Sequence, residues 1–106
     1  MKNVLKAGFA ILIFGLVFST WSLADAGGDT FKAKCAMCHG ADGAGQTAMG
    51  KTFKLRDLGS ADVQKQSDSD LNSIIANGKG KMPAYTGKLS ADDISNLVKY
   101  IRTLKK

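Results

Sequence analysis

Two cysteines three positions apart are followed directly by the only histidine of the chain, in the segment Cys35-Ala36-Met37-Cys38-His39. In this C-x-x-C-H order each thiol can add to one vinyl group of a haem, because a single helical turn presents both sulfurs to the same porphyrin edge. The adjacent imidazole can then bind the iron as the proximal ligand. The segment therefore predicts one covalently attached haem c, with Cys35 and Cys38 as thioethers and His39 as an axial iron ligand.

Three other chemistries could use the same residue types. A disulfide across the C-x-x-C pair would form a tight loop and would leave the histidine without a role. A thioredoxin-like redox pair is expected in a βαβ context, and the sequence has no alternating strand pattern. A zinc site needs about four ligands, so two Cys and one His would have to be completed by carboxylates, which are uncommon beside thiolates. Haem attachment is the interpretation that accounts for all three residues.

The second axial ligand decides between an electron-transfer haem and an open iron site. The chain has no second histidine, so a methionine thioether is the natural candidate. Met37 lies inside the attachment motif and cannot easily reach the opposite face of the haem, and Met49 is close in sequence to the proximal side. Met82 lies in a glycine-flanked loop between two expected helices, stiffened by Pro83. We predict Met82 as the ligand, with Met49 or an open site as the alternatives.

The first 26 residues have the features of a secretory signal peptide. A short basic start precedes an apolar run from Ala7 to about Leu23, and Ala24-Asp25-Ala26 fits the small-x-small cleavage pattern. We expect cleavage after Ala26, with Ala24 as the less favoured position, which leaves residues 27–106 as a single domain. An uncleaved membrane anchor is the alternative, because the run is close to the lower length limit of a spanning helix, about 17 residues.

Export and haem attachment support each other. Covalent haem attachment in bacteria takes place outside the cytoplasmic membrane, where an unused cysteine pair would be expected to form a disulfide. The formal net charge of +6 indicates acidic protein partners and not nucleic acid, since the chain is expected to be exported and has no base-reading motif. A mature chain of this size has a marginal core, so we expect the haem to supply apolar surface and the apoprotein to be poorly folded.

The elements that hold these residues are expected to be helices. A helix entering the haem motif should begin near Asp29 and end at Gly40, and the last helix carries apolar residues at i, i+3, i+4 and i+7 behind a capping box that starts at Ser90. The expected helices cover residues 29–35, 60–66, 67–77 and 90–106. Loops are expected at 40–46, 51–58 and 78–87. The sequence thus predicts an all-α fold of three to four short helices around one covalently bound haem.

With these features the chain resembles the class I cytochromes c, and specifically the short bacterial and algal kind. Cys35, Cys38 and His39 match the attachment and proximal positions of that family, and Met82-Pro83-Ala84-Tyr85 looks like its distal ligand loop. The resemblance covers nearly the whole expected mature chain. It implies a small monohaem cytochrome c domain over residues 27–106.

The resemblance also implies a contact between the first and last helices. Gly27 and Phe31 look like the family's N-terminal helix residues at this crossing, and Leu97 and Tyr100 look like their partners on the last helix. The family packs these two helices near a right angle, with small residues where they cross.

Two further positions bear on the haem. Arg56 resembles the residue that pairs with a buried haem propionate in some members, although a solvated surface arginine fits the sequence equally well. Many members have a proline shortly after the attachment motif whose carbonyl accepts the N–H of the proximal imidazole, and this chain has none there. A backbone carbonyl within residues 40–50 is therefore expected to accept from His39, because a ligating histidine normally donates its other nitrogen.

The expected function is that of a diffusible periplasmic electron carrier, not an enzyme, with the thylakoid lumen as an alternative location. Its redox protein partners should dock near the exposed haem edge through acidic surfaces, although the lysines could also be scattered solvating charge. The lysines expected around that edge are Lys51, Lys54, Lys79, Lys81 and Lys88.

Two other functions stay open. One is a tethered or subunit cytochrome domain of an oxidase or dehydrogenase complex, with the membrane reached only through partner complexes or an uncleaved leader. The other is a haem peroxidase or sensor with an open distal site, for which no distal His or Arg constellation is evident.

Overall fold

The structure is a computed structural model that describes residues 22–106. Within this range the regular elements are six helices, and no strand is formed beyond two isolated bridges. In chain order they are α1 (Leu23–Lys34), α2 (Ala36–His39), α3 (Ala48–Thr52), α4 (Ala61–Gln64), α5 (Asp68–Asn77) and α6 (Ala91–Thr103). The all-α prediction is confirmed. The expected number of three to four helices was too low, because three of the six helices have only four or five residues and are too short to leave a periodic pattern in the sequence.

The first helix begins six residues earlier than expected. Ser22 caps α1: its hydroxyl accepts the Asp25 N–H at 3.1 Å, while the Asp25 carboxylate accepts the Ser22 N–H at 3.4 Å. This reciprocal pair satisfies two of the otherwise unpaired N–H groups at the helix start, so Asp29 lies inside the helix and does not begin it. The expected start at Asp29 was therefore wrong.

The predicted leader falls largely on residues 1–21, which lie outside the described part of the chain. Both expected cleavage positions, Ala24 and Ala26, lie in the first turn of α1. Between residues 22 and 106, none of the helices has the length and apolar character required to cross a bilayer.

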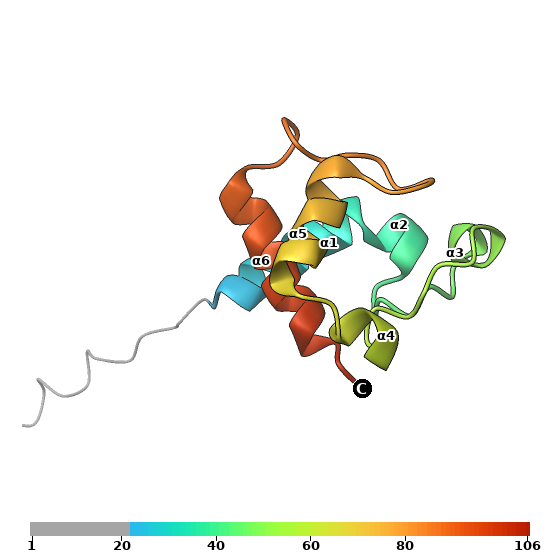
Figure 1. Cartoon of the computed structure of the whole chain (residues 1–106). Coiled ribbons are helices and arrows are strands. Elements are labelled where there is room, and N and C mark those ends of the chain that lie inside the picture. Colours follow the sequence, from blue (N-terminus) through green and yellow to red (C-terminus); the bar gives the residue numbers. More distant parts are fainter. Residues whose placement is uncertain (1–21) are drawn as a thin grey trace, which may run out of the picture.

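Helices α1 and α6 pack together at two adjacent glycines. An ideal Cβ built on Gly27 would lie 2.1 Å from the Asn96 carbonyl oxygen, and one on Gly28 would lie 3.0 Å from the Tyr100 ring. One turn further along α1, the rings of Phe31 and Tyr100 have their centroids 5.1 Å apart. In Figure 1 the two helices accordingly lie against each other. The expected contact between the first and last helices is confirmed.

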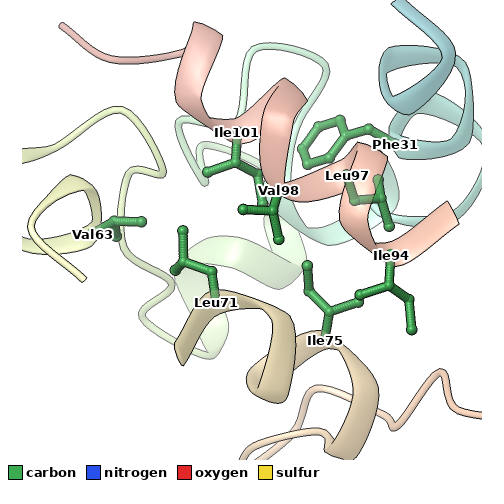
Figure 2. Packing of buried hydrophobic residues seen from close by; sticks show 8 residues of the cluster. All are labelled: Phe31, Val63, Leu71, Ile75, Ile94, Leu97, Val98 and Ile101. Carbon is green, nitrogen blue, oxygen red and sulfur yellow. The ribbon is translucent and has the colours of Figure 1, made fainter. Parts of the chain in front are cut away.

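The core is built around the apolar face of α6. Figure 2 shows the Phe31 ring of α1 lying against α6, with Leu71 and Ile75 of α5 pointing toward the same helix. Phe31 and Leu97 are each only 1% exposed, and burying such a side chain contributes roughly 1.5–3 kcal/mol. The buried apolar residues are Phe31, Val63, Leu71, Ile75, Ile94, Leu97, Val98 and Ile101.

The segment after the haem motif is more helical than expected. Residues 51 and 52 belong to α3, so the loop predicted at 51–58 is partly wrong. Thr47 explains the difference, because its hydroxyl accepts the Gly50 N–H at 2.8 Å and donates to the Cys38 carbonyl at 2.5 Å. One threonine thus caps α3 and anchors it to α2.

The connection between α4 and α5 is tied to α6 by one arginine. The Arg102 guanidinium donates to the Gln66 carbonyl at 2.6 Å, to the Gln64 carbonyl at 2.9 Å and to the Asp68 carboxylate. Ser67 caps α5 by accepting the Asp70 N–H at 3.0 Å, whereas Ser60, at the start of α4, forms no such side-chain bond. The predicted helices near 60–66 and 67–77 are both present.

Candidate haem site

Two neighbouring cavities lie between the attachment motif and the loop that follows α5. The larger has a volume of about 260 Å³ and is walled mainly by apolar side chains, and the smaller has about 60 Å³. Cys35, His39, Leu55 and Met82 line both cavities. An apolar cleft with a few polar groups converging on it is the usual form of a cofactor site. The chain therefore brings the motif and the distal loop to one site, although they are over forty residues apart in sequence.

The chain bends at Cys35, between α1 and α2, and Cys38 follows inside α2. Cys35 ends α1 with φ −114°, and its carbonyl accepts the N–H groups of Cys38 at 3.2 Å and His39 at 3.0 Å. Cys35 lines both cavities and Cys38 the smaller one, and the two form no disulfide. Burial, with the neighbouring Cys38 charge as the lesser cause, raises the pKa of the Cys35 thiol to about 11. Both sulfurs are thus presented from one short turn at one side of the site.

The imidazole of His39 is suited to metal binding. Burial lowers its pKa, which favours the neutral form that coordinates metals. Its Nδ1 atom is buried and has no hydrogen-bond partner. The hydrogen bond expected from this ring to a backbone carbonyl within residues 40–50 is therefore not formed. The backbone there is held differently: the Gly45 N–H donates to the His39 carbonyl at 2.7 Å, so this nearby loop bonds the main chain and not the ring.

A zinc centre finds no support in the donor set. Over residues 22–106, nowhere do three or more His, Cys, Asp or Glu side chains gather closely enough to hold a metal ion. A structural zinc site needs about four such ligands. The cysteines and histidine are therefore not completed by carboxylates.

Met82 is presented by a loop that is fixed at both ends. Its N–H and carbonyl pair with those of Lys79 at 2.9 and 3.1 Å, and Gly78, with φ +78°, turns the chain out of α5. Further along, the Tyr85 and Thr86 N–H groups donate to carbonyls in the last turn of α5 at 3.1 and 3.0 Å. The thioether thus stands on a short, hydrogen-bonded loop at the rim of both cavities.

The other two methionines considered from the sequence do not reach the site. Met37 is 79% exposed and Met49 is 42% exposed, and neither lines either of these two cavities. Of the three candidates, only Met82 shares the site with His39.

The larger cavity is rimmed by cationic side chains. Arg56, Lys54 and Lys79 line it, and no acidic residue lines either cavity. Apolar walls, two thiols, an uncommitted imidazole and a cationic rim suit a haem, whose ring is apolar and whose two propionates are anionic. The residues present therefore fit this group.

Two contributors to the site were not predicted. Lys34 lines the smaller cavity together with Lys81, and Gln66 lines the larger one. No local pattern marks either residue: Lys34 is placed by the bend at Cys35, and Gln66 lies in the connection between α4 and α5. Of the expected lysines, Lys51 and Lys88 line neither cavity.

Comparisons with known proteins agree with this geometry. The profile of the family described as "Cytochrome C oxidase, cbb3-type, subunit III" matches residues 22–101. Cytochrome c6 of Leptolyngbya boryana is 41% identical over 78 residues, which covers 74% of this chain and 88% of that protein. Cytochrome c6 of a Picosynechococcus species is 35% identical over 109 aligned positions, which covers 95% and 92%.

A solved structure extends the likeness to the fold. A c-type cytochrome, KustC0563, superposes with a TM-score of 0.70 at 30% identity, and the match covers 76% of this chain and 98% of that one. The chain therefore belongs to the class I monohaem c-type cytochromes: it is an electron-transfer protein, not an enzyme, and holds one covalently bound haem c.

Proposed function

We propose that this protein is a diffusible electron carrier of the periplasm, with the thylakoid lumen as the alternative compartment, whose haem is attached through Cys35 and Cys38 and ligated by His39 and Met82. The observation that carries the proposal is that His39 and Met82 line both cavities, whereas the other methionines line neither. When bound, the haem supplies a ferric/ferrous couple that exchanges one electron. Two protein ligands leave no iron position for peroxide or a gas, which favours electron transfer over catalysis or sensing.

The surrounding side chains tune and hold this site. Apolar walls exclude water, and a thioether ligand favours a relatively high reduction potential. Arg56 is proposed to pair with a haem propionate, because it lines the larger cavity and forms no ion pair with any residue between 22 and 106. A cation at this position would offset the charge of a carboxylate placed in an apolar cleft.

Redox partners are proposed to dock where lysines surround the smaller cavity. Lys34 and Lys81 line it next to both cysteines, and the Lys81 ammonium lies 5.9 Å from the centre of the Phe53 ring. Cations around an apolar patch at the attachment edge suit a partner with an acidic surface. The docking site would then be centred on Lys34 and Lys81, with Lys54 and Lys79 on the larger cavity.

The ligand assignment is tested with matched methionine variants of the holoprotein. Met82→Ala should remove the weak far-red absorption band of the ferric protein, lower the reduction potential and allow carbon monoxide to bind the ferrous iron. Met49→Ala is the control, because that side chain is exposed and lines neither cavity. A Met82→Ala protein that keeps its far-red band and excludes carbon monoxide would overturn the assignment.

A second function is favoured by the family match. The matching profile is named for a subunit of a cbb3-type oxidase, which supports a role as a cytochrome domain inside a membrane complex. Fractionation and intact-mass measurement separate the two functions. A soluble protein without its leader and with one covalent haem supports the free carrier, and a protein that co-purifies with an oxidase supports the subunit.

A further inference from the structure

The bend at Cys35 leaves a backbone carbonyl at the end of α1 without its helical partner. In a continuous α-helix the Cys38 N–H would donate to the Lys34 carbonyl, four residues back. Here that N–H donates to the Cys35 carbonyl instead, at 3.2 Å. The Lys34 carbonyl is therefore one of the acceptors that a helix end leaves for side chains or water.

The phenol of Tyr85 takes up this acceptor. Its hydroxyl donates to the Lys34 carbonyl at 3.2 Å, across 51 residues of sequence. The Tyr85 backbone is itself fixed, because its N–H donates to the Ile75 carbonyl at 3.1 Å and its carbonyl accepts the N–H groups of Lys88 and Leu89, each at 2.9 Å. The side chain thus extends from an anchored residue to the start of the attachment motif.

The same residue lies in the segment that carries Met82. Tyr85 is three positions after Met82, and both line the smaller cavity together with Cys35 and Cys38. The hydroxyl bond therefore joins the distal loop to the attachment segment beside this cavity. A movement that carries the whole segment from Met82 to Tyr85 away from the attachment motif has to break or stretch this bond.

We propose that the Tyr85 hydroxyl is a latch that positions Met82 by holding the distal loop against the carbonyl of Lys34. The latch slows the opening of the loop and thereby the access of external ligands to the iron. It rests on the proposed ligation by Met82. Tyr85 is a positioning residue, since it acts through Met82 and through the loop backbone.

The test compares Tyr85→Phe with Tyr100→Phe in the ferric holoprotein. Both variants lose one phenol hydroxyl, but within residues 22–106 the Tyr100 hydroxyl makes no hydrogen bond, and its ring packs at the α1–α6 contact. The rate of imidazole binding is followed by stopped-flow absorption, because imidazole can enter only after Met82 has left. Unfolding in denaturant is measured on the same samples.

The latch predicts a specific change in rate. Tyr85→Phe should bind imidazole about threefold to tenfold faster than the wild type, the range expected for losing one neutral hydrogen bond, and should keep its far-red band. Tyr100→Phe should bind at the wild-type rate.

Three results would overturn the latch, and they have different meanings. Equal rates in Tyr85→Phe and wild type, with the far-red band intact, would reject the latch alone. Equal acceleration in both variants, together with equal losses of unfolding stability, would show a merely structural role. A wild-type protein without a far-red band would reject Met82 ligation and the latch with it.

Discussion

The contact between α1 and α6 leaves no space for a side chain at Gly27. A Cβ there would lie 2.1 Å from the Asn96 carbonyl oxygen and 2.6 Å from its carbon, where ordinary contacts begin at 3.4 Å. Both atoms are backbone, so Gly27→Ala can be accommodated only if the helices separate. At Gly28 the added Cβ would meet the Tyr100 ring at 3.0–3.1 Å, a longer distance and to a side chain instead of backbone, so the required shift is only a few tenths of an ångström.

These distances give different energies for two chemically identical substitutions. Overpacking a tight contact costs about 1–3 kcal/mol, and replacing a helical glycine by alanine gains about 1 kcal/mol. Because the Gly27 clash is with backbone, its cost lies in the upper part of that range, about 2–3 kcal/mol, and Gly27→Ala should lose about 1–2 kcal/mol of unfolding free energy after the gain in helix propensity. Gly28→Ala, which meets a side chain at a longer distance, should be close to neutral. For a domain of this size, the loss in Gly27→Ala corresponds to a fall in Tm of roughly 5–15 °C.

The assay is thermal and urea unfolding of the ferric holoproteins, followed by far-ultraviolet circular dichroism. Because both variants gain the same methyl group and the same helix propensity, their difference compares the backbone contact with Asn96 against the side-chain contact with Tyr100. A Gly27→Ala protein as stable as the wild type, or a Gly28→Ala protein destabilised to the same degree, would show that the α1–α6 contact does not exclude a side chain at Gly27.

Two further predictions concern charge. The Lys106 ammonium lies 2.5 Å from the Asp57 carboxylate and holds the pKa of that carboxyl below its usual value. The stability that this ion pair contributes is therefore present above about pH 4 and is lost as the pH falls through the lowered pKa. In urea unfolding, Asp57→Asn should therefore be less stable than the wild type at pH 7, and this difference in stability should disappear toward pH 3. The control Asp62→Asn, which removes an exposed ion pair, should change the stability little. A difference between Asp57→Asn and wild type that persists at pH 3 would contradict this linkage. Electron transfer to the partner should slow as ionic strength rises, and stopped-flow kinetics should show a weaker salt dependence for Lys81→Ala than for Lys99→Ala, which lies away from both cavities. A rate indifferent to salt would remove the proposed docking surface.

The parts of the site that are local in sequence could be predicted. The C-x-x-C-H motif contains its chemistry within five residues, and α6 is marked by its capping box and by an apolar periodicity of nearly four turns. The contact between α1 and α6 followed from family resemblance at Gly27 and Phe31. Periodicity alone does not say which two helices meet.

The remaining features depend on contacts that no short pattern encodes. α3 is five residues long and is held by the bond from Thr47 to the Cys38 carbonyl, which joins two segments nine residues apart. Lys34 was missed because its place beside the smaller cavity follows from the bend at Cys35. The expected helix start at Asp29 was wrong because residues 1–26 were assigned to the leader. The capping box of Ser22 and Asp25 was therefore not considered as the start of a helix.

Whether a carbonyl of residues 40–50 can accept a hydrogen bond from the His39 ring depends on the course of the backbone in that loop. The 40–50 loop turns its Gly45 N–H, and not a carbonyl, toward the backbone of His39. Glycines with positive φ at positions 40, 43 and 45 determine that course. Composition indicates that such a loop can turn sharply, but not whether one of its carbonyls reaches the His39 ring.

The iron is proposed to be ligated by His39 and Met82 in a haem attached at Cys35 and Cys38. This ligation is tested most directly by absorption spectra of the oxidised and reduced protein, produced in an exporting host that attaches haem. Ligation by His39 and Met82 predicts a sharp α-band in the reduced protein and a weak far-red band in the oxidised one. A high-spin spectrum would contradict Met82 ligation, and a protein without covalent haem would contradict the interpretation of the motif itself.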